Sequence, residues 1–226
     1  MKIDREILRT FTILIALFFF FEFTNIDLFV QNFFYDNSSN QWVVEHVKDS
    51  LLDTIFYTGI KKVIIVITVL VLFLYLYSFK ESAKKLREYR SGLLIVWLSV
   101  AAVPLIISLL KATTNIPCPC DAVLFGGDYP YIRALDPMPQ EILKKFKCYP
   151  AGHASGGFAL MSLYFLFKSK KNQILGLVIA IIIGWSMGIY KMLIGHHYLS
   201  HTVITMLLSW LLIGIIKKIV NKYCKL

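Results

Sequence analysis

The sequence predicts an all-α integral membrane protein, and three observations carry that prediction: composition, the clustering of apolar residues, and the distribution of charge. Of the 226 residues, 57% are apolar and 15% are aromatic, and mean hydropathy is +0.65. Soluble domains are roughly half apolar. The apolar residues gather in long blocks instead of following the period of an amphipathic core. Length allows one domain or two small ones, and we interpret residues 1–226 as a single membrane domain.

Six apolar blocks are candidate transmembrane helices, since a span needs about 20 residues and fewer where its ends are shared with loops. They cover residues 7–24, 60–78, 92–110, 154–167, 174–194 and 202–216. The fourth and sixth blocks are short. The first has a basic start but lacks the small-residue cleavage pattern of a signal peptide, so we interpret it as a span. The expected architecture is a bundle of about six transmembrane helices.

Basic residues give these six spans an orientation. Both termini and the segments 79–91 and 168–173 share one side, which holds 15 of the 24 lysine and arginine residues. By the positive-inside bias this side is cytoplasmic. We therefore predict a multi-pass protein of the cytoplasmic (inner) membrane with cytoplasmic termini. The net charge of +10 then requires no nucleic-acid partner.

Two long polar stretches, residues 25–59 and 112–153, fall on the opposite, extracytoplasmic side. The first alternates aromatic and polar residues, with Trp42 as an interfacial anchor. It is either a simple connection or a lid over a lipid site. The second runs from Lys111 to His153 and contains six prolines, which predicts loops and turns in place of a long helix.

Histidines mark the ends of the predicted helices that border these stretches, at His153 and in the group "GHHYLSH". One interpretation is a metal site, because His197 and His201 are four residues apart and His153 could be a third ligand. Neither short motif contains a carboxylate, and the nearby Lys111 and Lys191 oppose a bound cation. A second interpretation is structural, with the imidazoles bonded to backbone carbonyls at the membrane interface.

A third interpretation is phosphoryl transfer through histidine. This chemistry needs fixed cations, N–H donors at a helix N-terminus, a nucleophile and an acid for the leaving group. Lys111 and Lys191 can supply the cations, and the helix start at Gly152 can supply the donors. Imidazole titrates near neutral pH, so His197 can attack while His153 donates a proton.

At these residues the chain resembles the type 2 phosphatidic acid phosphatase (PAP2) superfamily, membrane lipid phosphatases related to vanadium haloperoxidases. The family pattern is Lys, six residues, Arg-Pro; then Pro-Ser-Gly-His; then Ser-Arg, five residues, His, three residues, Asp. The corresponding strings are "KATTNIPCP", "PAGH" and "YKMLIGHHYLSH". Lys111, His153 and His197 match, whereas Cys118, Ala151, Tyr190, Lys191 and His201 replace Arg, Ser, Ser, Arg and Asp. The resemblance covers about residues 92–216.

The resemblance implies a PAP2-like helical bundle that needs no metal or other cofactor. It implies that His197 is a nucleophile forming a phosphohistidine and that His153 protonates the leaving group. Lys111 and Lys191, with the backbone at Ala151 and Gly152, would bind the phosphoryl oxygens.

The substitutions modify these expectations. Lys191 offers a point charge where Arg offers a bidentate fork, and His201 can accept the hydrogen bond of the family's Asp but supplies no negative charge. Cys118 cannot replace a cation at all. We expect Arg133, or one of Lys144, Lys145 and Lys147, to take that place. Carboxylates of the long loop are expected to assist His197; the candidates are Asp121, Asp128 and Asp136.

The same resemblance, to variant bacterial members, implies a disulfide between Cys118 and Cys148, with Cys120 as the rival partner. A loop of about 30 residues closed in this way stabilises by roughly 3–4 kcal/mol in the chain-entropy model. Cys224 would be a free thiol on the cytoplasmic side. Beyond His153, the small residues Ser155, Gly156 and Gly157 favour close helix packing.

Function follows from the resemblance as an expectation. The chain would be a membrane lipid phosphatase that hydrolyses a lipid phosphate or pyrophosphate on the periplasmic or extracytoplasmic face. Its partner would be a phospholipid or glycolipid phosphate in the membrane, with lipid A, undecaprenyl pyrophosphate and phosphatidylglycerol phosphate as candidates. A lipid phosphotransferase with the same intermediate and a non-catalytic lipid-binding or transport protein remain the alternatives.

Overall fold

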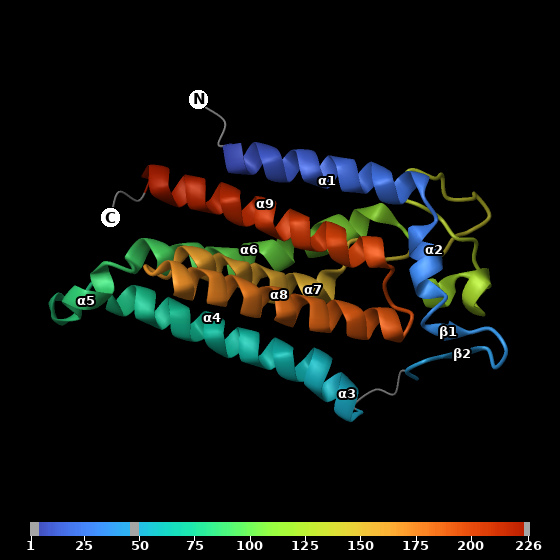
Figure 1. The fold of residues 1–226 in the computed structure, drawn as a ribbon, viewed down its shortest axis with the longest axis horizontal. Helices are drawn as coiled ribbons and strands as arrows, with labels where there is room; N and C mark the ends of the chain where they lie inside the picture. The colour runs from blue at the N-terminus through green and yellow to red at the C-terminus, as the bar shows by residue number, and fades with distance from the viewer. Residues whose placement is uncertain (1–4, 46–49, 224–226) are drawn as a thin grey trace.

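The computed structural model describes residues 5–45 and 50–223, and this part of the chain is a bundle of nearly parallel and antiparallel helices (Figure 1). The first and last helices approach each other at the end of the bundle that also carries the short helix α5 (Lys84–Arg87). The opposite end is capped by α2 (Ile26–Gln31) and a small hairpin. Cys224, for which a free thiol was predicted, lies outside the described residues.

Among the described residues, four helices are long and apolar enough to cross a membrane. One runs from Leu51 to Tyr77 and comprises α3 (Leu51–Asp53), a π-helical turn (Thr54–Gly59) and α4 (Ile60–Tyr77). The others are α6 (Arg90–Thr114), α8 (Lys170–Leu193) and α9 (Leu199–Tyr223). Large apolar side chains such as Val66 and Phe73 of α4 point outward, as expected for a surface in contact with lipid.

The two remaining apolar blocks are helical but are not candidate spans: α1 is long enough but too charged, and α7 is too short. The helix α1 (Arg5–Phe23) includes Glu6, Arg9 and Glu22. The helix α7 (Gly152–Ala159) has only 8 residues before the chain tightens into a 3-10 helix (Leu160–Phe165). The described residues therefore form a mostly helical bundle with four candidate membrane spans, and the predicted count of six is not confirmed.

The short helix α7 lies at the centre of the bundle, packed against α6, α8 and α9. Phe158 of α7 is fully buried, as are Val103 of α6 and Ile213 of α9. A Cβ at Gly157 would lie 2.7 Å from the backbone of Gly184, so only glycine permits this approach of α7 to α8. The packing role predicted for the small residues after His153 is thus met at Gly157.

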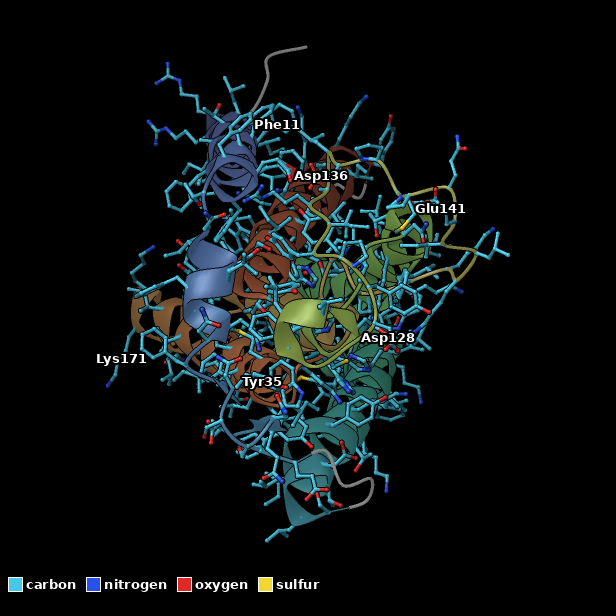
Figure 2. The ribbon with its side chains drawn as sticks, turned by 90° about the vertical axis from the view of Figure 1, so that its right-hand side faces the viewer. Phe11, Tyr35, Asp128, Asp136, Glu141 and Lys171 are labelled. Carbon is cyan, nitrogen blue, oxygen red and sulfur yellow. A yellow bond between two sulfur atoms is a disulfide. The ribbon has the colours of Figure 1, made fainter. Side chains whose placement is uncertain are left out.

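The polar stretches form the cap. Residues 25–59 contain α2 and the antiparallel pair β1 (Tyr35–Asp36) and β2 (Gln41–Trp42), joined in the register Tyr35↔Trp42. The candidate span that contains α4 begins at Leu51, nine residues before the apolar block, because the mixed segment 51–59 is helical too. Residues 115–151 are loops with 3-10 turns at Pro119–Asp121 and Val123–Phe125, as the prolines predict. Figure 2 views this capped end, with Tyr35, Asp128 and Asp136 labelled.

Candidate active site

The structure brings the three motifs together beneath the cap. Lys111 lies in the last turn of α6, His153 in the first turn of α7, and Lys191 in the last turn of α8. His197 occupies the connection between α8 and α9, and His201 the first turn of α9. The ring centroids of His153 and His197 are 6.1 Å apart, and those of His197 and His201 are 5.6 Å apart. Residues up to 90 positions apart in sequence therefore share one site.

A tight turn after α8 positions His197. Gly195 has a φ of +72°, which favours glycine, and a Cβ there would lie 2.4 Å from the Trp42 ring of β2. The Gly195 carbonyl accepts a hydrogen bond from the backbone N–H of Cys120 at 2.8 Å, and the backbone N–H of His197 donates to the Lys191 carbonyl at 3.2 Å. The hairpin and the long loop thus fix the turn from two sides.

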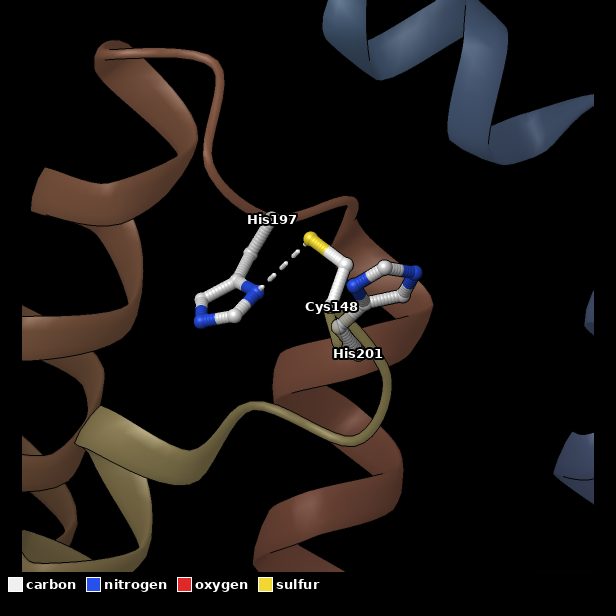
Figure 3. Close-up of side chains that lie close together, drawn as sticks. All are labelled: Cys148, His197 and His201. Atoms are coloured by element: carbon white, nitrogen blue, oxygen red, sulfur yellow. Dashed lines mark hydrogen bonds between the residues drawn. The ribbon is translucent and has the colours of Figure 1, made fainter. Parts of the chain in front are cut away.

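The imidazole of His197 is only 2% exposed. Its Nδ1 lies 3.7 Å from the sulfur of Cys148 (Figure 3), while Nε2 is buried with no hydrogen-bond partner in the described part of the chain. Burial, followed by His201 and Lys111, lowers the pKa of His197 well below its usual value of 6.5. His197 is therefore neutral at physiological pH, and a nitrogen lone pair is available for attack.

Cys148 is joined to Cys118 by a disulfide, the pairing that the resemblance implied. Within the described residues, Cys120 is the free cysteine. Ligand atoms of Cys148, His197 and His201 lie within 4.8 Å of one another, which raises the metal interpretation again. A disulfide sulfur cannot become a thiolate ligand, and the two remaining imidazoles make an incomplete set for a tetrahedral metal. These residues fit an ion poorly.

His153 lies close to residues of the turn before α4 and of α8. The edge of the Tyr57 ring meets its imidazole, with centroids 4.7 Å apart, and the Lys191 ammonium lies 4.4 Å from the centroid of Tyr57. The Lys111 side chain passes Gly152, where a Cβ would be 3.5 Å from its Cδ. Burial, then the charges of Lys111 and Lys191, lowers the pKa of His153 to about 3.

A cavity of about 530 Å³ opens beside His153 between α4, α6 and α7. Its polar end is lined by Lys111, Gly152, His153, Tyr57 and Lys61. The rest of its wall is mainly apolar and follows the bundle between α4 and α6; it includes Ile64, Ile65, Val69, Val100 and Met187. A ligand with a negatively charged head and an apolar tail matches this distribution of side chains.

The backbone N–H groups at the start of α7 are not all available to donate a hydrogen bond to a ligand. The Ala151 N–H donates to the His201 carbonyl at 3.2 Å, so it is committed within the protein, although the resemblance had assigned it to phosphate. The first turn of α7 has no side-chain cap, and its N–H groups have no intrahelical acceptor. Gly152 and His153 thus present donors and the positive end of the helix dipole beside Lys111.

The expected substitutes for the missing arginine do not reach the site. Arg133 donates to the Asn25 side chain at 2.6 Å, and Lys144 pairs with Asp121 at 2.8 Å. Lys145 and Lys147 are exposed. The place of the arginine is instead taken by Cys118, whose disulfide ties this loop to the segment before α7.

The carboxylates expected to assist His197 do not approach it either. Asp121 is engaged by Lys144 and by the Cys118 N–H, and Asp136 accepts the Arg133 N–H. Asp128 is exposed at the surface of the cap (Figure 2). His201 is adjacent to His197, yet no hydrogen bond joins these two rings in the described structure.

Sequence reasoning missed Tyr57 and Lys61. Tyr57 belongs to the π-helical turn between α3 and α4, and such turns are frequent at functional sites. Nothing in the string "TIFYTG" distinguishes this tyrosine from an interfacial aromatic anchor. The one available signal was "IKKV", a pair of lysines at the start of an apolar block.

The long apolar helices indicate a membrane protein. The histidines and lysines gathered at the helix ends suit the binding of phosphate. The sequence model of the PAP2 superfamily matches residues 92–224, more than half of the chain and all three motifs. The chain therefore belongs to the PAP2 superfamily, which indicates phosphatase-type chemistry. Comparison with curated proteins and with solved structures returned no match.

Proposed function

We propose that this protein is a membrane lipid phosphatase that releases phosphate from a lipid phosphate or lipid pyrophosphate through a phosphohistidine on His197. The cavity beside His153 is the observation that carries the proposal. It joins a cationic, histidine-containing end to an apolar wall between α4 and α6. A phosphate attached to a hydrocarbon chain suits both parts, whereas a soluble phosphate would leave the apolar part unused.

In the first half-reaction, Nε2 of His197 attacks phosphorus, a P–N bond forms, and the bond from phosphorus to the leaving oxygen breaks. His153 gives its proton to that oxygen. Lys111, Lys191 and the N–H groups at the start of α7 stabilise the charge on the equatorial oxygens. In the second half-reaction His153 takes a proton from water, the water oxygen attacks phosphorus, and the P–N bond breaks to release inorganic phosphate.

Binding of the substrate prepares His153 for this role. Without a ligand, burial and two lysine charges keep its pKa at about 3, so it holds no proton to donate near pH 7. A phosphate dianion between Lys111 and Lys191 cancels their repulsion and favours the imidazolium. The acid is thus formed when the substrate is present.

The location of the site supports catalysis at the membrane surface. The basic segments around α5 and the two terminal helices lie at one end of the bundle, and the site lies toward the other (Figure 1). By the positive-inside bias the site faces the extracytoplasmic side of a cytoplasmic membrane. Lipid A, undecaprenyl pyrophosphate and phosphatidylglycerol phosphate are the candidate substrates.

The test is phosphate release by purified protein in detergent from a panel of lipid mono- and pyrophosphates, with a chelator present. We expect chelator-resistant release that falls by at least about a hundredfold in His197→Ala. Lys62→Ala, on the exposed surface of α4, is the matched control and should retain activity. Release that required an added lipid acceptor would replace hydrolysis by phosphotransfer. Lipid binding without any release would make the protein a non-catalytic member of the superfamily.

A further inference from the structure

A second cavity, of about 30 Å³, is lined by His201 but not by His197. It is enclosed by the end of α1, by α2, by the loop 131–134 and by the start of α9. Its polar lining consists of Glu22, Asp27, Tyr131, Arg133, Tyr149, Tyr198, Ser200 and His201. This volume exceeds the 10–15 Å³ that a water molecule needs. It shares no lining residue with the larger cavity beside His153.

His201 forms the wall between this cavity and His197. It lines the cavity, and one of its ring nitrogens belongs to the group that lies within 4.8 Å of His197 and Cys148. Figure 3 shows this nitrogen facing the sulfur and the other pointing away from it. The nitrogen that faces the sulfur is Nδ1, which is bonded to the ring carbon that carries the side chain (Figure 3). This Nδ1 is buried with no hydrogen-bond partner in the described part of the chain, and so is the hydroxyl of Tyr198, a residue that lines the cavity. Buried polar atoms of this kind are normally satisfied by a partner or by ordered water.

Asp27 supplies a carboxylate to the same cavity. It is 4% exposed, and its Oδ1 accepts the Ser200 N–H at 2.8 Å, which attaches α2 to the residue before His201. The other acidic residue, Glu22, accepts the N–H groups of Ala134 and Leu135, one on each oxygen. Burial raises the pKa of Asp27 to about 6, so it is largely ionised at pH 7. Asp27 thus places a negative charge in the same cavity as the imidazole that replaced the family's aspartate.

We propose that Asp27 is the positioning residue for this site: acting across the small cavity, it orients His201, and His201 in turn orients His197. Asp27 accepts a hydrogen bond, directly or through one water, from the nitrogen of His201 that points away from His197. The opposite nitrogen of His201 then carries a lone pair toward Nδ1–H of His197. This tautomer leaves Nε2 of His197 free to attack. The inference rests on the proposed function, because it assigns a role in that reaction.

The charge of Asp27 also matters after the attack. Formation of the P–N bond makes the His197 imidazole positive, and a negative charge behind His201 stabilises that state. A carboxylate two groups away has a weaker effect than one in direct contact, so activity should respond to a carboxylate introduced at position 201.

The experiment compares phosphate release by wild type, Asp27→Asn, His201→Asp and the double variant. Asn keeps an oxygen for the Ser200 N–H, so α9 stays capped. We expect Asp27→Asn to lower kcat about ten- to a hundredfold with KM unchanged. His201→Asp places a carboxylate beside His197. In that background Asp27→Asn should therefore lower kcat by less than about threefold. Glu22→Gln, in the same cavity, should show equal effects in both backgrounds.

Equal losses from Asp27→Asn in both backgrounds, or a loss of folding with unchanged kcat, would mean that Asp27 is only structural. An independent readout does not need turnover. The ¹⁵N shifts of His201, assigned by their disappearance in His201→Asp, report its tautomer, and they should change in Asp27→Asn and stay the same in Glu22→Gln. Unchanged His201 shifts in Asp27→Asn would overturn the proposal even if no lipid phosphate proves to be a substrate, and changed shifts would support it in that case.

Discussion

The two histidines that face each other, His153 and His197, are both neutral in the ligand-free protein for the same reason. His197 is buried and His153 is half-buried, and the pKa of each is lowered by burial and by the charge of Lys111. For His197 this state suits a nucleophile. In the proposed mechanism His153 gains its proton when a phosphate arrives, so we expect substrate binding and proton binding to be coupled.

Binding of a phosphate analogue such as vanadate should therefore be accompanied by proton uptake near pH 7. Isothermal titration calorimetry in buffers with different ionisation enthalpies measures the number of protons taken up. We expect a value well above zero in the wild type and close to zero in His153→Gln. Equal uptake in both proteins would exclude His153 as the group that gains the proton.

The same lowered pKa values predict how stability depends on pH. The unfolded chain binds protons at histidine near pH 6.5, whereas the folded, ligand-free protein does not until the pH falls far lower. Stability contributed by the neutral imidazoles is thus complete above about pH 6.5 and is lost as the pH falls below it. Thermal unfolding in detergent should occur at a lower temperature at pH 5 than at pH 7, and His153→Gln should reduce the difference.

The helix α7, which contains His153, packs unusually closely against α8. Gly157→Ala would bring a Cβ to 2.7 Å from the Gly184 backbone, and overpacking of this kind costs about 1–3 kcal/mol. Gly156→Ala is the matched control, because its Cβ would meet Ile64 at an ordinary 3.5 Å. The temperature of thermal unfolding should fall clearly in Gly157→Ala and should not change in Gly156→Ala. The same result for both would mean that α7 can shift away from α8.

The loop between α6 and α7 depends on the disulfide from Cys118 to Cys148. Its 30-residue separation predicts a loss of roughly 3–4 kcal/mol on reduction in the chain-entropy model. Because Cys148 contacts His197, activity should decline as well. Unfolding temperature and phosphate release should both fall in Cys118→Ser, and in wild type treated with a reductant. Cys120→Ser should match the wild type, and a Cys118→Ser protein with normal stability would contradict this role.

The molecule as a whole aligns a polar site with an apolar cavity that runs along its membrane-facing helices. Thr68 lines this cavity on α4, whereas Val66 on the same helix is 65% exposed and points away from it. Thr68→Trp should therefore lower kcat/KM for a long-chain lipid phosphate at least about tenfold, a loss of roughly 1.4 kcal/mol in transition-state binding. Turnover of a short, soluble phosphate ester should remain.

Val66→Trp changes the same helix by the same side chain without entering the cavity, so it should leave both substrates unaffected. If Thr68→Trp reduced the turnover of long and short substrates equally, the cavity would not be the binding place of the lipid chain.

The sequence predicted the features that depend on nearby residues, and it did not predict those that depend on contacts between residues far apart in the chain. Apolar blocks predicted the helices, because a membrane span is a local property of composition. The motifs predicted that Lys111, His153 and His197 share one site, because each motif was expected at or beside the end of a predicted helix. The length of α7 was not predictable, since a short buried helix and a short span have the same apolar composition. The role of Asp27 depends on α2 folding over α9, a contact between residues 173 positions apart.

The predictions about which cation would replace the missing arginine at Cys118 were wrong for a similar reason. A missing arginine suggested that another cation would approach, yet Arg133 is held by Asn25 and Lys144 by Asp121. Partners of charged side chains depend on how a loop folds, and a loop rich in proline does not reveal its path in sequence. Tyr57 was overlooked because an aromatic residue at a membrane interface usually anchors the protein and does nothing more.

The most direct test of the account is to trap the covalent intermediate. Protein mixed with a lipid phosphate and quenched within milliseconds at alkaline pH, where phosphohistidine survives, would be digested and examined by mass spectrometry. We expect one phosphate on His197, absent in His197→Ala and accumulating in His153→Gln supplied with a substrate whose leaving group needs no proton. Phosphate release by the wild type with no phosphorylated residue, or with the phosphate on another side chain, would contradict the proposed mechanism.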